Sequence, residues 1–179
     1  SIYRPHLFLA RELKPNTKER VCRRVLELLK SHGLPAIVYV TKPKEAESLL
    51  LDLRRKLANE AIVLETYHGP GRSGRVKQSD AERTRVLADF LAERVDVIVA
   101  TCAFGLGINK RGIRQVVHVS VPHNFLDGYV QEIGRGGRGG VPARCTLLVS
   151  WRPAPQGTSK DPPGFASPVS RADAIRAIG

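Results

Sequence analysis

Short apolar runs alternate along most of this chain with segments whose apolar residues recur at helical spacing, and this alternation limits the possible folds more than any other feature. The apolar runs with strand character are residues 36–41, 61–66, 95–101, 115–121 and 144–150. Strands that alternate with helices over short connections pair in parallel and are covered by helices on both faces. The sequence therefore predicts an α/β fold with three layers, in which a mainly parallel sheet lies between helices.

The residues between these runs carry signals for helix ends and for inward-facing helix surfaces. The residues predicted to begin or end helices are Asn16 with Glu19, Gly33, Pro43, Ser79 with Glu82, and Asn124. The apolar residues predicted to face the core are Val21, Val25, Leu28 and Leu29, then Leu49, Leu50, Leu53 and Leu57, then Val86, Leu87, Phe90 and Leu91. Residues 2–10 are apolar enough for an edge strand. Functional loops are expected at the carboxyl ends of the strands, where Thr101 and His68 fall.

Two glycine-containing loops flank the strand predicted at 115–121. In the first loop, Gly105 and Gly107 allow the main chain to turn sharply and leave its amides open to an anion. In the second loop, Arg135 and Arg138 are three residues apart, so both guanidinium groups can converge on one polyanionic target. The sequence predicts that this target is a phosphate.

The charge balance indicates a nucleic-acid partner. Lysine and arginine outnumber aspartate and glutamate by 29 to 17, which gives a formal net charge of +12 at pH 7. A small domain with this excess suits a partner that carries a dense array of negative charge. A generically basic, solvated surface is the alternative explanation. No apolar run approaches the roughly 20 residues of a membrane-spanning helix, so no membrane anchoring is expected.

The three cysteines, Cys22, Cys102 and Cys145, lack any Cys-x-x-Cys spacing. Their odd number and their spacing indicate neither a disulfide framework nor a zinc site, and no metal-ligand set is predicted. They suit a reduced, intracellular location, which would be nuclear in a eukaryote, and no signal peptide is visible. The chain begins at Ser1 and contains no methionine, so we expect an excised piece of a longer protein.

Composition divides the chain into three parts. These are a domain at 1–151, a linker rich in proline, glycine and serine at 152–169, and a short helix at 170–179. Within the domain, the segment 70–77 contains three cations and no acid. This segment is predicted to be either a mobile basic finger near nucleic acid or a solvated surface loop.

The two glycine-containing loops resemble motifs V and VI of superfamily 2 helicases, most closely those of the RecQ family. That family carries Ala-Thr-x-Ala-Phe-Gly-x-Gly-Ile-Asn-Lys followed by Gln-Glu-x-Gly-Arg-x-Gly-Arg, and this chain matches the first pattern almost completely from Ala100 to Lys110. The resemblance extends more weakly from Arg4 to Ser150, and His6 stands where the family has asparagine. It implies the second RecA-like domain of an ATP-dependent DNA helicase that translocates 3′ to 5′ and acts in DNA unwinding, repair and recombination.

The resemblance also implies roles at the nucleotide. Arg138 would be the arginine finger, and Arg135 would lie beside it on the γ-phosphate of ATP. Further residues placed against the bound ATP are Gln131, Gly134, Gly107 and Asn109. Arginine suits the finger role because its planar fork stays charged and can grip two phosphate oxygens at once.

A second implied set of residues contacts DNA. Its members are Thr101, Gly105, Lys110, His68, Thr41 and Lys42. The Thr101 hydroxyl and the amides around Gly105 would follow a DNA phosphate, so that one loop touches both ligands and couples hydrolysis to stepping. His68 is either a contact to the nucleic-acid backbone or a local structural hydrogen-bonder. Residues 40–43 stand where RecQ proteins carry Cys-Asn-Ser-Arg, so the usual arginine is missing and a helix cap with solvated lysines is the alternative.

The chain lacks the other half of an ATPase site. No phosphate-wrapping loop of the form Gly-x-x-x-x-Gly-Lys-[Ser/Thr] occurs in it, and its one motif II lookalike, at 80–83, falls at a predicted helix start. ATP and Mg²⁺ would be bound mainly by a first RecA-like domain of the same protein, so this domain alone is expected to be inactive. The alternatives are a superfamily 2 RNA helicase or remodelling motor, a non-catalytic nucleic-acid-binding derivative of a helicase, and, for residues 134–140, a disordered RNA-binding segment.

Overall fold

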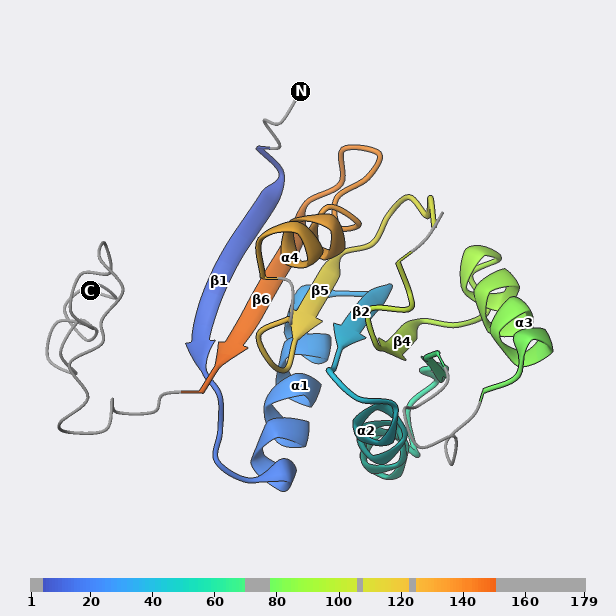
Figure 1. Cartoon of the computed structure of the whole chain (residues 1–179), viewed down its shortest axis with the longest axis horizontal. Coiled ribbons are helices and arrows are strands. Elements are labelled where there is room, and N and C mark those ends of the chain that lie inside the picture. The colour runs from blue at the N-terminus through green and yellow to red at the C-terminus, as the bar shows by residue number, and fades with distance from the viewer. Residues whose placement is uncertain (1–4, 70–77, 106–107, 123–124, 151–179) are drawn as a thin grey trace, which may run out of the picture.

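The computed structural model describes residues 5–69, 78–105, 108–122 and 125–150 (Figure 1). The predicted linker, the helix at 170–179, the basic segment 70–77, Gly107 and the Asn124 cap lie outside these residues. The strands are β1 (Leu7–Leu13), β2 (Ala36–Tyr39), β3 (Leu64–Tyr67), β4 (Val97–Ala100), β5 (Gln115–His118) and β6 (Ala143–Val149). The helices are α1 (Lys18–His32), α2 (Pro43–Lys56), α3 (Asp80–Leu91) and α4 (Phe125–Ile133).

The strands form one parallel sheet in the order β1-β6-β5-β2-β4-β3. Each neighbouring pair is parallel, including β1 with β6, which come from opposite ends of the described chain. Helices α1 and α2 pack on one face of the sheet, and α3 and α4 pack on the other. The predicted three-layer α/β fold is therefore confirmed. Within the described part of the chain, no helix combines the length and apolar character needed to cross a membrane.

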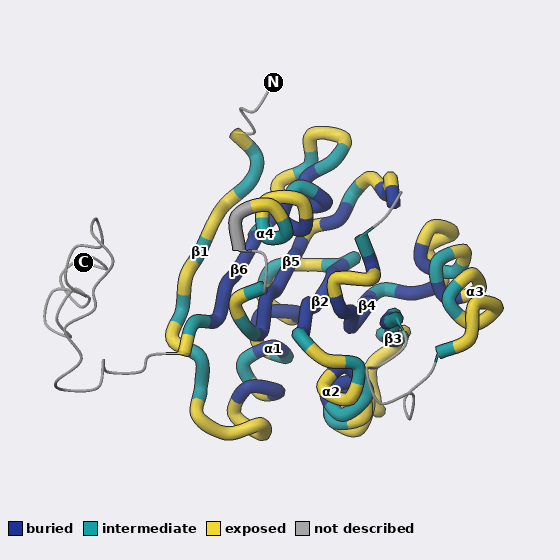
Figure 2. Tube along the Cα trace, in the orientation of Figure 1, coloured by how far each residue is buried: buried dark blue, intermediate teal, exposed yellow. Residues whose placement is uncertain are grey.

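The core consists of two apolar clusters, one on each face of the sheet, because side chains alternate in direction along each strand. On β4, Val97 and Val99 join the cluster under α1 and α2, while Ile98 and Ala100 join the cluster under α3 and α4. Every residue of β2, β4 and β5 is buried, as expected of parallel strands that are covered on both faces (Figure 2). The loops that follow these strands thus start from rigid, fully buried positions.

Helix α1 begins one residue later than the sequence predicted. Thr17, not Asn16, is its N-cap, and the Thr17 hydroxyl accepts a hydrogen bond from the Arg20 N–H at 3.3 Å. Thr17 has the extended backbone that an N-cap requires, with φ of −115° and ψ of 150°, and its side chain reaches the third helical N–H. The other predicted helix ends within the described residues are confirmed: Gly33, Pro43, and the capping box of Ser79 with Glu82.

Helix α3 buries a narrower stripe than the sequence predicted. Val86 and Phe90 are buried, but Leu91 is 46% exposed, so its predicted core position is wrong. The reason is that α3 packs on β3, the edge strand, where the sheet is too narrow to cover a wide helix face. Phe90 lies one helical turn after Val86 on the same face of α3. The Leu91 side chain points about 100° away from that of Phe90 around the helix axis. The other apolar residues predicted to face the core are buried or half-buried.

The first glycine-containing loop begins at one end of the strands, and the second lies at the other end. Thr101 follows β4 directly, and its N–H donates to the Tyr67 carbonyl at the end of β3, at 3.2 Å. This is the carboxyl edge, as predicted for Thr101 and His68. The second loop, which comprises residues 134–142 and is named the arginine loop, lies near the amino ends, because the Gly112 N–H, just before β5, donates to the Arg138 carbonyl at 3.0 Å. The prediction that functional loops lie at carboxyl ends is wrong for this loop, since a connection from a helix into a parallel strand must reach that strand's amino end.

Candidate functional site

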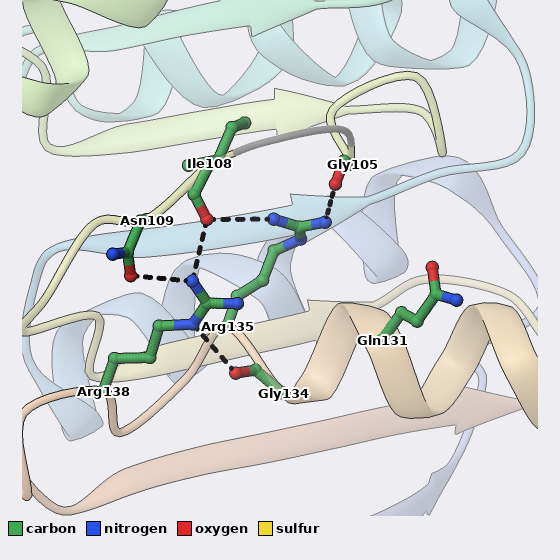
Figure 3. A pocket seen from close by; sticks show the side chains of 7 residues that line it. All are labelled: Gly105, Ile108, Asn109, Gln131, Gly134, Arg135 and Arg138. Carbon is green, nitrogen blue, oxygen red and sulfur yellow. Dashed lines mark hydrogen bonds between the residues drawn. The ribbon is translucent and has the colours of Figure 1, made fainter.

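A hollow of about 460 Å³ brings the two glycine-containing loops together (Figure 3). The residues that line it are Gly105, Ile108, Asn109, Gln131, Gly134, Arg135 and Arg138. All of them except Ile108 belong to the residue sets predicted from the sequence. The first loop crosses from the carboxyl ends of the strands toward the amino ends, and this crossing brings it against the arginine loop.

Both guanidinium groups converge on one main-chain oxygen in this hollow. Nη1 of Arg135 lies 3.4 Å from the Ile108 carbonyl oxygen, and Nη1 of Arg138 lies 2.9 Å from the same oxygen. Arg138 also donates from Nη1 to Asn109 Oδ1 at 2.9 Å and from Nε to the Gly134 carbonyl at 3.2 Å. Arg135 donates from Nη2 to the Gly105 carbonyl. The first loop therefore fixes the orientation of both cations through its own oxygens (Figure 3).

The two arginines differ in their access to solvent. Arg135 is only 5% exposed, and its Nε is buried without a hydrogen-bond partner among the described residues. Arg138 is half-buried at the rim of the hollow. A buried N–H without a partner is unfavourable unless an acceptor reaches it. Arg135 thus joins the two loops and retains unused donor capacity, while Arg138 is the more accessible cation for an anion in the hollow.

Phe104 anchors the first loop, a role that the sequence analysis did not assign. Its side chain is fully buried, and its ring makes edge contacts with the rings of Tyr67 and Phe90 at centroid distances of 4.8 and 5.8 Å. The Tyr39 hydroxyl donates to the Phe104 carbonyl at 3.0 Å. Burial raises the pKa of Tyr39, so this hydroxyl keeps its proton and remains a donor. The available signal was that Phe104 is the one aromatic residue in the sequence of this loop.

Helix α4 is fixed to the sheet by a buried polar pair that the sequence analysis also missed. Glu132, next to the site residue Gln131, is 6% exposed, and its Oε2 lies 2.8 Å from Nε2 of His118 on β5. The His118 ring stacks on Tyr39 at a centroid distance of 5.0 Å and meets the edge of Tyr129 at 4.9 Å. Side chains from β2, β5 and α4 thus connect the anchor of the first loop to the helix that carries the second.

Two of the predicted DNA-contacting residues at the carboxyl edge, His68 and Thr41, have side-chain partners nearby. His68 is 1% exposed, and its Nε2 lies 2.8 Å from Glu47 Oε1, which is the arrangement that the structural alternative predicted. The Thr41 hydroxyl donates to Glu45 Oε2 at 2.9 Å, and Lys42 is the exposed N-cap residue of α2, although its side chain makes no capping hydrogen bond. The DNA contacts of these residues stay predictions.

Two further members of that set are largely buried. Thr101 is 5% exposed, with its main chain bonded to the end of β3. Lys110 is also 5% exposed, and its ammonium lies 3.5 Å from Glu93 Oε1 and 5.2 Å from the Phe90 ring centroid. Lys110 therefore ties the end of the first loop to the end of α3, which is a structural role that the sequence did not predict. A contact of either residue with DNA stays a prediction.

Substitution at Gly137 is expected to disrupt the arginine loop. Gly137 has φ of 67°, and a Cβ there would lie 2.7 Å from His6 Cδ2, 3.0 Å from Leu7 Cδ2 and 3.1 Å from the Val141 carbonyl oxygen. Gly137→Ala should lower the free energy of unfolding by about 1–2 kcal/mol for the left-handed backbone and by about 1–3 kcal/mol more for the overlap. Denaturant titration of the chain measures this loss.

Gly112→Ala is the matched control, because Gly112 has φ of 79°, but a Cβ added there would meet no described atom within 4 Å. Gly112→Ala should lower the free energy of unfolding only by the cost of the left-handed backbone, about 1–2 kcal/mol. Equal losses at the two positions would show that the close packing around Gly137 does not contribute.

Residues 17–140 match the model of the helicase conserved C-terminal domain. This chain belongs to that helicase family. It is 34% identical over 148 residues to a probable ATP-dependent DNA helicase, RecS, of Bacillus subtilis, a match that covers 83% of this chain and 27% of RecS. It is 37% identical over 119 residues to the RecQ-like DNA helicase blm-1 of Caenorhabditis elegans, which covers 66% of this chain and 11% of blm-1. The chain thus spans about a quarter or less of these relatives, and the predicted resemblance to RecQ helicases is confirmed.

A solved helicase structure has the same fold as this helicase domain. The Mycobacterium smegmatis helicase Lhr, bound to single-stranded DNA and AMP-PNP, superimposes with a TM-score of 0.65 at 22% identity, over 80% of this chain and 19% of the Lhr chain. At this level of identity the likeness concerns the fold alone. Together with the parallel sheet, it supports the predicted RecA-like domain.

Proposed function

We propose that this chain is the C-terminal motor domain of an ATP-dependent DNA helicase that translocates 3′ to 5′, and that Arg138 is its arginine finger. The observation that carries the proposal is the convergence of Arg135 and Arg138 in one hollow, held there by the carbonyl oxygens of the first loop. Such an arrangement preorganises two positive charges for a charged oxygen before the ligand arrives. Action in DNA repair and recombination belongs to the same proposal.

The hollow fits the terminal phosphate of ATP. Two cations line it without any carboxylate, and Arg135 Nε is buried and lacks a partner among the described residues. Mg²⁺-ATP, bound mainly by a phosphate-loop domain outside this chain, supplies the phosphoryl group that is transferred. Arg138 would grip the oxygens of that group, and the Gln131 and Asn109 amides would orient it. Arg138 could replace its bond to the exposed Asn109 carboxamide with a bond to phosphate at small cost, because one acceptor substitutes for another.

In this proposal, the first loop is the physical route from ATP to DNA. It begins at Thr101 on the carboxyl edge of the sheet and lines the hollow through Gly105, Ile108 and Asn109. A phosphate contact made at one end of this loop would move the main chain at the other end. We therefore propose that Thr101 and the Gly105 amide region face the DNA strand while the later residues respond to hydrolysis.

The test compares ATP turnover and strand separation by the complete protein with those of the 179-residue chain. The complete protein should hydrolyse ATP in a DNA-stimulated manner and should unwind duplexes with a 3′ single-stranded tail but not those with a 5′ tail. The chain alone should hydrolyse none, because it holds no phosphate-wrapping loop, yet it should bind DNA with an affinity that falls as salt rises. Stimulation by RNA alone would favour the RNA-motor alternative, and DNA binding without any turnover by the complete protein would favour the non-catalytic one.

A further inference from the structure

A second hollow, of about 380 Å³, adjoins the first one. The residues that line it are His6, Asn109, Arg111, Gly137, Arg138, Gly139 and Gly140. Asn109 and Arg138 line both hollows, so the two are neighbours that share one guanidinium group. A ligand that fills the first hollow can therefore extend into the second without leaving Arg138.

The second hollow has the charge of an anion site. Arg111 and Arg138 line it, together with the imidazole of His6, and no carboxylate does. Within the described part of the chain, neither the Arg111 guanidinium nor the His6 imidazole makes a hydrogen bond or an ion pair. Unpaired donors that converge on one hollow are available to a negatively charged group.

Two glycines of the arginine loop leave room for these two side chains. A Cβ at Gly139 would lie 3.5 Å from Arg111 Cβ and 3.6 Å from its Cδ, so the Arg111 stem rests against this glycine. A Cβ at Gly137 would lie 2.7 Å from His6 Cδ2, so the imidazole occupies the space that a larger residue would fill. Both side chains thus lie close to the loop that carries Arg138.

We propose that Arg111 and His6 form a second phosphate-binding subsite beside Arg138, which binds the phosphate next to the one in the first hollow. The ligand is then a nucleoside triphosphate whose consecutive phosphates lie one in each hollow. Both phosphates accept hydrogen bonds from the Arg138 guanidinium group. Arg138 suits this position because a planar guanidinium can donate in two directions at once. The inference rests on the proposed function for the identity of the ligand, and on the second hollow for the extra subsite.

The test is a titration of the 179-residue chain with tripolyphosphate at constant ionic strength, followed by NMR or calorimetry. Arg111→Ala should weaken binding by roughly tenfold or more, since it removes a charge-assisted hydrogen bond. Arg111→Lys should restore part of this loss, and His6→Asn should produce a smaller loss. The control is Arg20→Ala, which removes one exposed positive charge from α1 and should change binding by no more than about twofold at this ionic strength.

Two results would overturn the subsite. One is tripolyphosphate binding by Arg111→Ala that equals binding by Arg20→Ala. The other is a loss that appears with a single-stranded oligothymidylate but not with tripolyphosphate, which would assign Arg111 to nucleic acid instead. Turnover by the complete protein separates this failure from failure of the proposed function. If the complete protein shows DNA-stimulated turnover but Arg111→Ala does not change tripolyphosphate binding, only the subsite is rejected. If tripolyphosphate binding depends on Arg111 but the complete protein shows no turnover, the proposed function is rejected and the subsite is kept.

Discussion

Arg138→Ala is expected to lower ATP turnover by the complete protein by a factor on the order of 10³ to 10⁵, which is the usual contribution of an arginine finger. Arg138 mainly stabilises charge that grows on the transferred phosphoryl group in the transition state, and most of the ATP affinity is expected to come from the phosphate-loop domain, so ATP and DNA binding by the complete protein should change far less than turnover. The geometry supports this view, because Arg138 sits at the rim of the hollow and is oriented by Ile108 and Asn109. Single-turnover hydrolysis at saturating ATP measures the effect.

Variants at neighbouring positions make this prediction specific. Arg138→Lys should recover little activity, since a point charge cannot reproduce the bidentate grip. Arg135→Ala should also slow turnover, but it should destabilise the fold as well, because Arg135 is buried and bonded to the Gly105 carbonyl. Arg23→Ala, which removes a 61%-exposed arginine side chain from α1, is the control and should leave turnover unchanged. A rate for Arg138→Ala within a few-fold of wild type would contradict the finger assignment.

Phe104→Ala is expected to lower the free energy of unfolding by about 3–5 kcal/mol, the range seen when a fully buried aromatic ring is truncated. Phe104 is fully buried, and its ring makes edge contacts with Tyr67 and Phe90 that the variant would lose. The substitution also frees the start of the first loop, so the hollow should lose its fixed geometry together with stability. Chemical denaturation of the chain measures the change as a lower midpoint with an unchanged slope.

Phe8→Ala provides a matched comparison. Phe8 lies on the edge strand β1 and is 58% exposed, so the same deletion there should change stability by no more than about 0.5 kcal/mol. Phe104→Leu should lose less than Phe104→Ala, because it keeps much of the buried volume. A loss at Phe104 no larger than that at Phe8 would show that the ring does not anchor the loop.

Local patterning in the sequence was enough to predict the fold class and the two loops of the candidate site. Apolar runs that alternate with helical periodicity can bury their surfaces in few ways, so the parallel sheet between helices follows from spacing alone. The capping box of Ser79 with Glu82 was also predictable from local sequence, because the two residues are only three positions apart. Of the seven residues that line the first hollow, Gly105, Arg135 and Arg138 were predicted from this patterning, whereas Asn109, Gln131 and Gly134 were implied by the resemblance to RecQ helicases.

Contacts between residues far apart in the chain decided the rest. The pairing of β1 with β6, the His68–Glu47 contact, and the Lys110 contact with Glu93 all join segments whose relative positions no local pattern encodes. The burial of Arg135 under the first loop also depends on contacts between distant segments. So does the second hollow, which is lined by His6 from the start of the domain together with Arg111 and Arg138. Periodicity specifies which face of an element is buried, whereas strand order and packing specify what it is buried against, and only the folded chain contains that information.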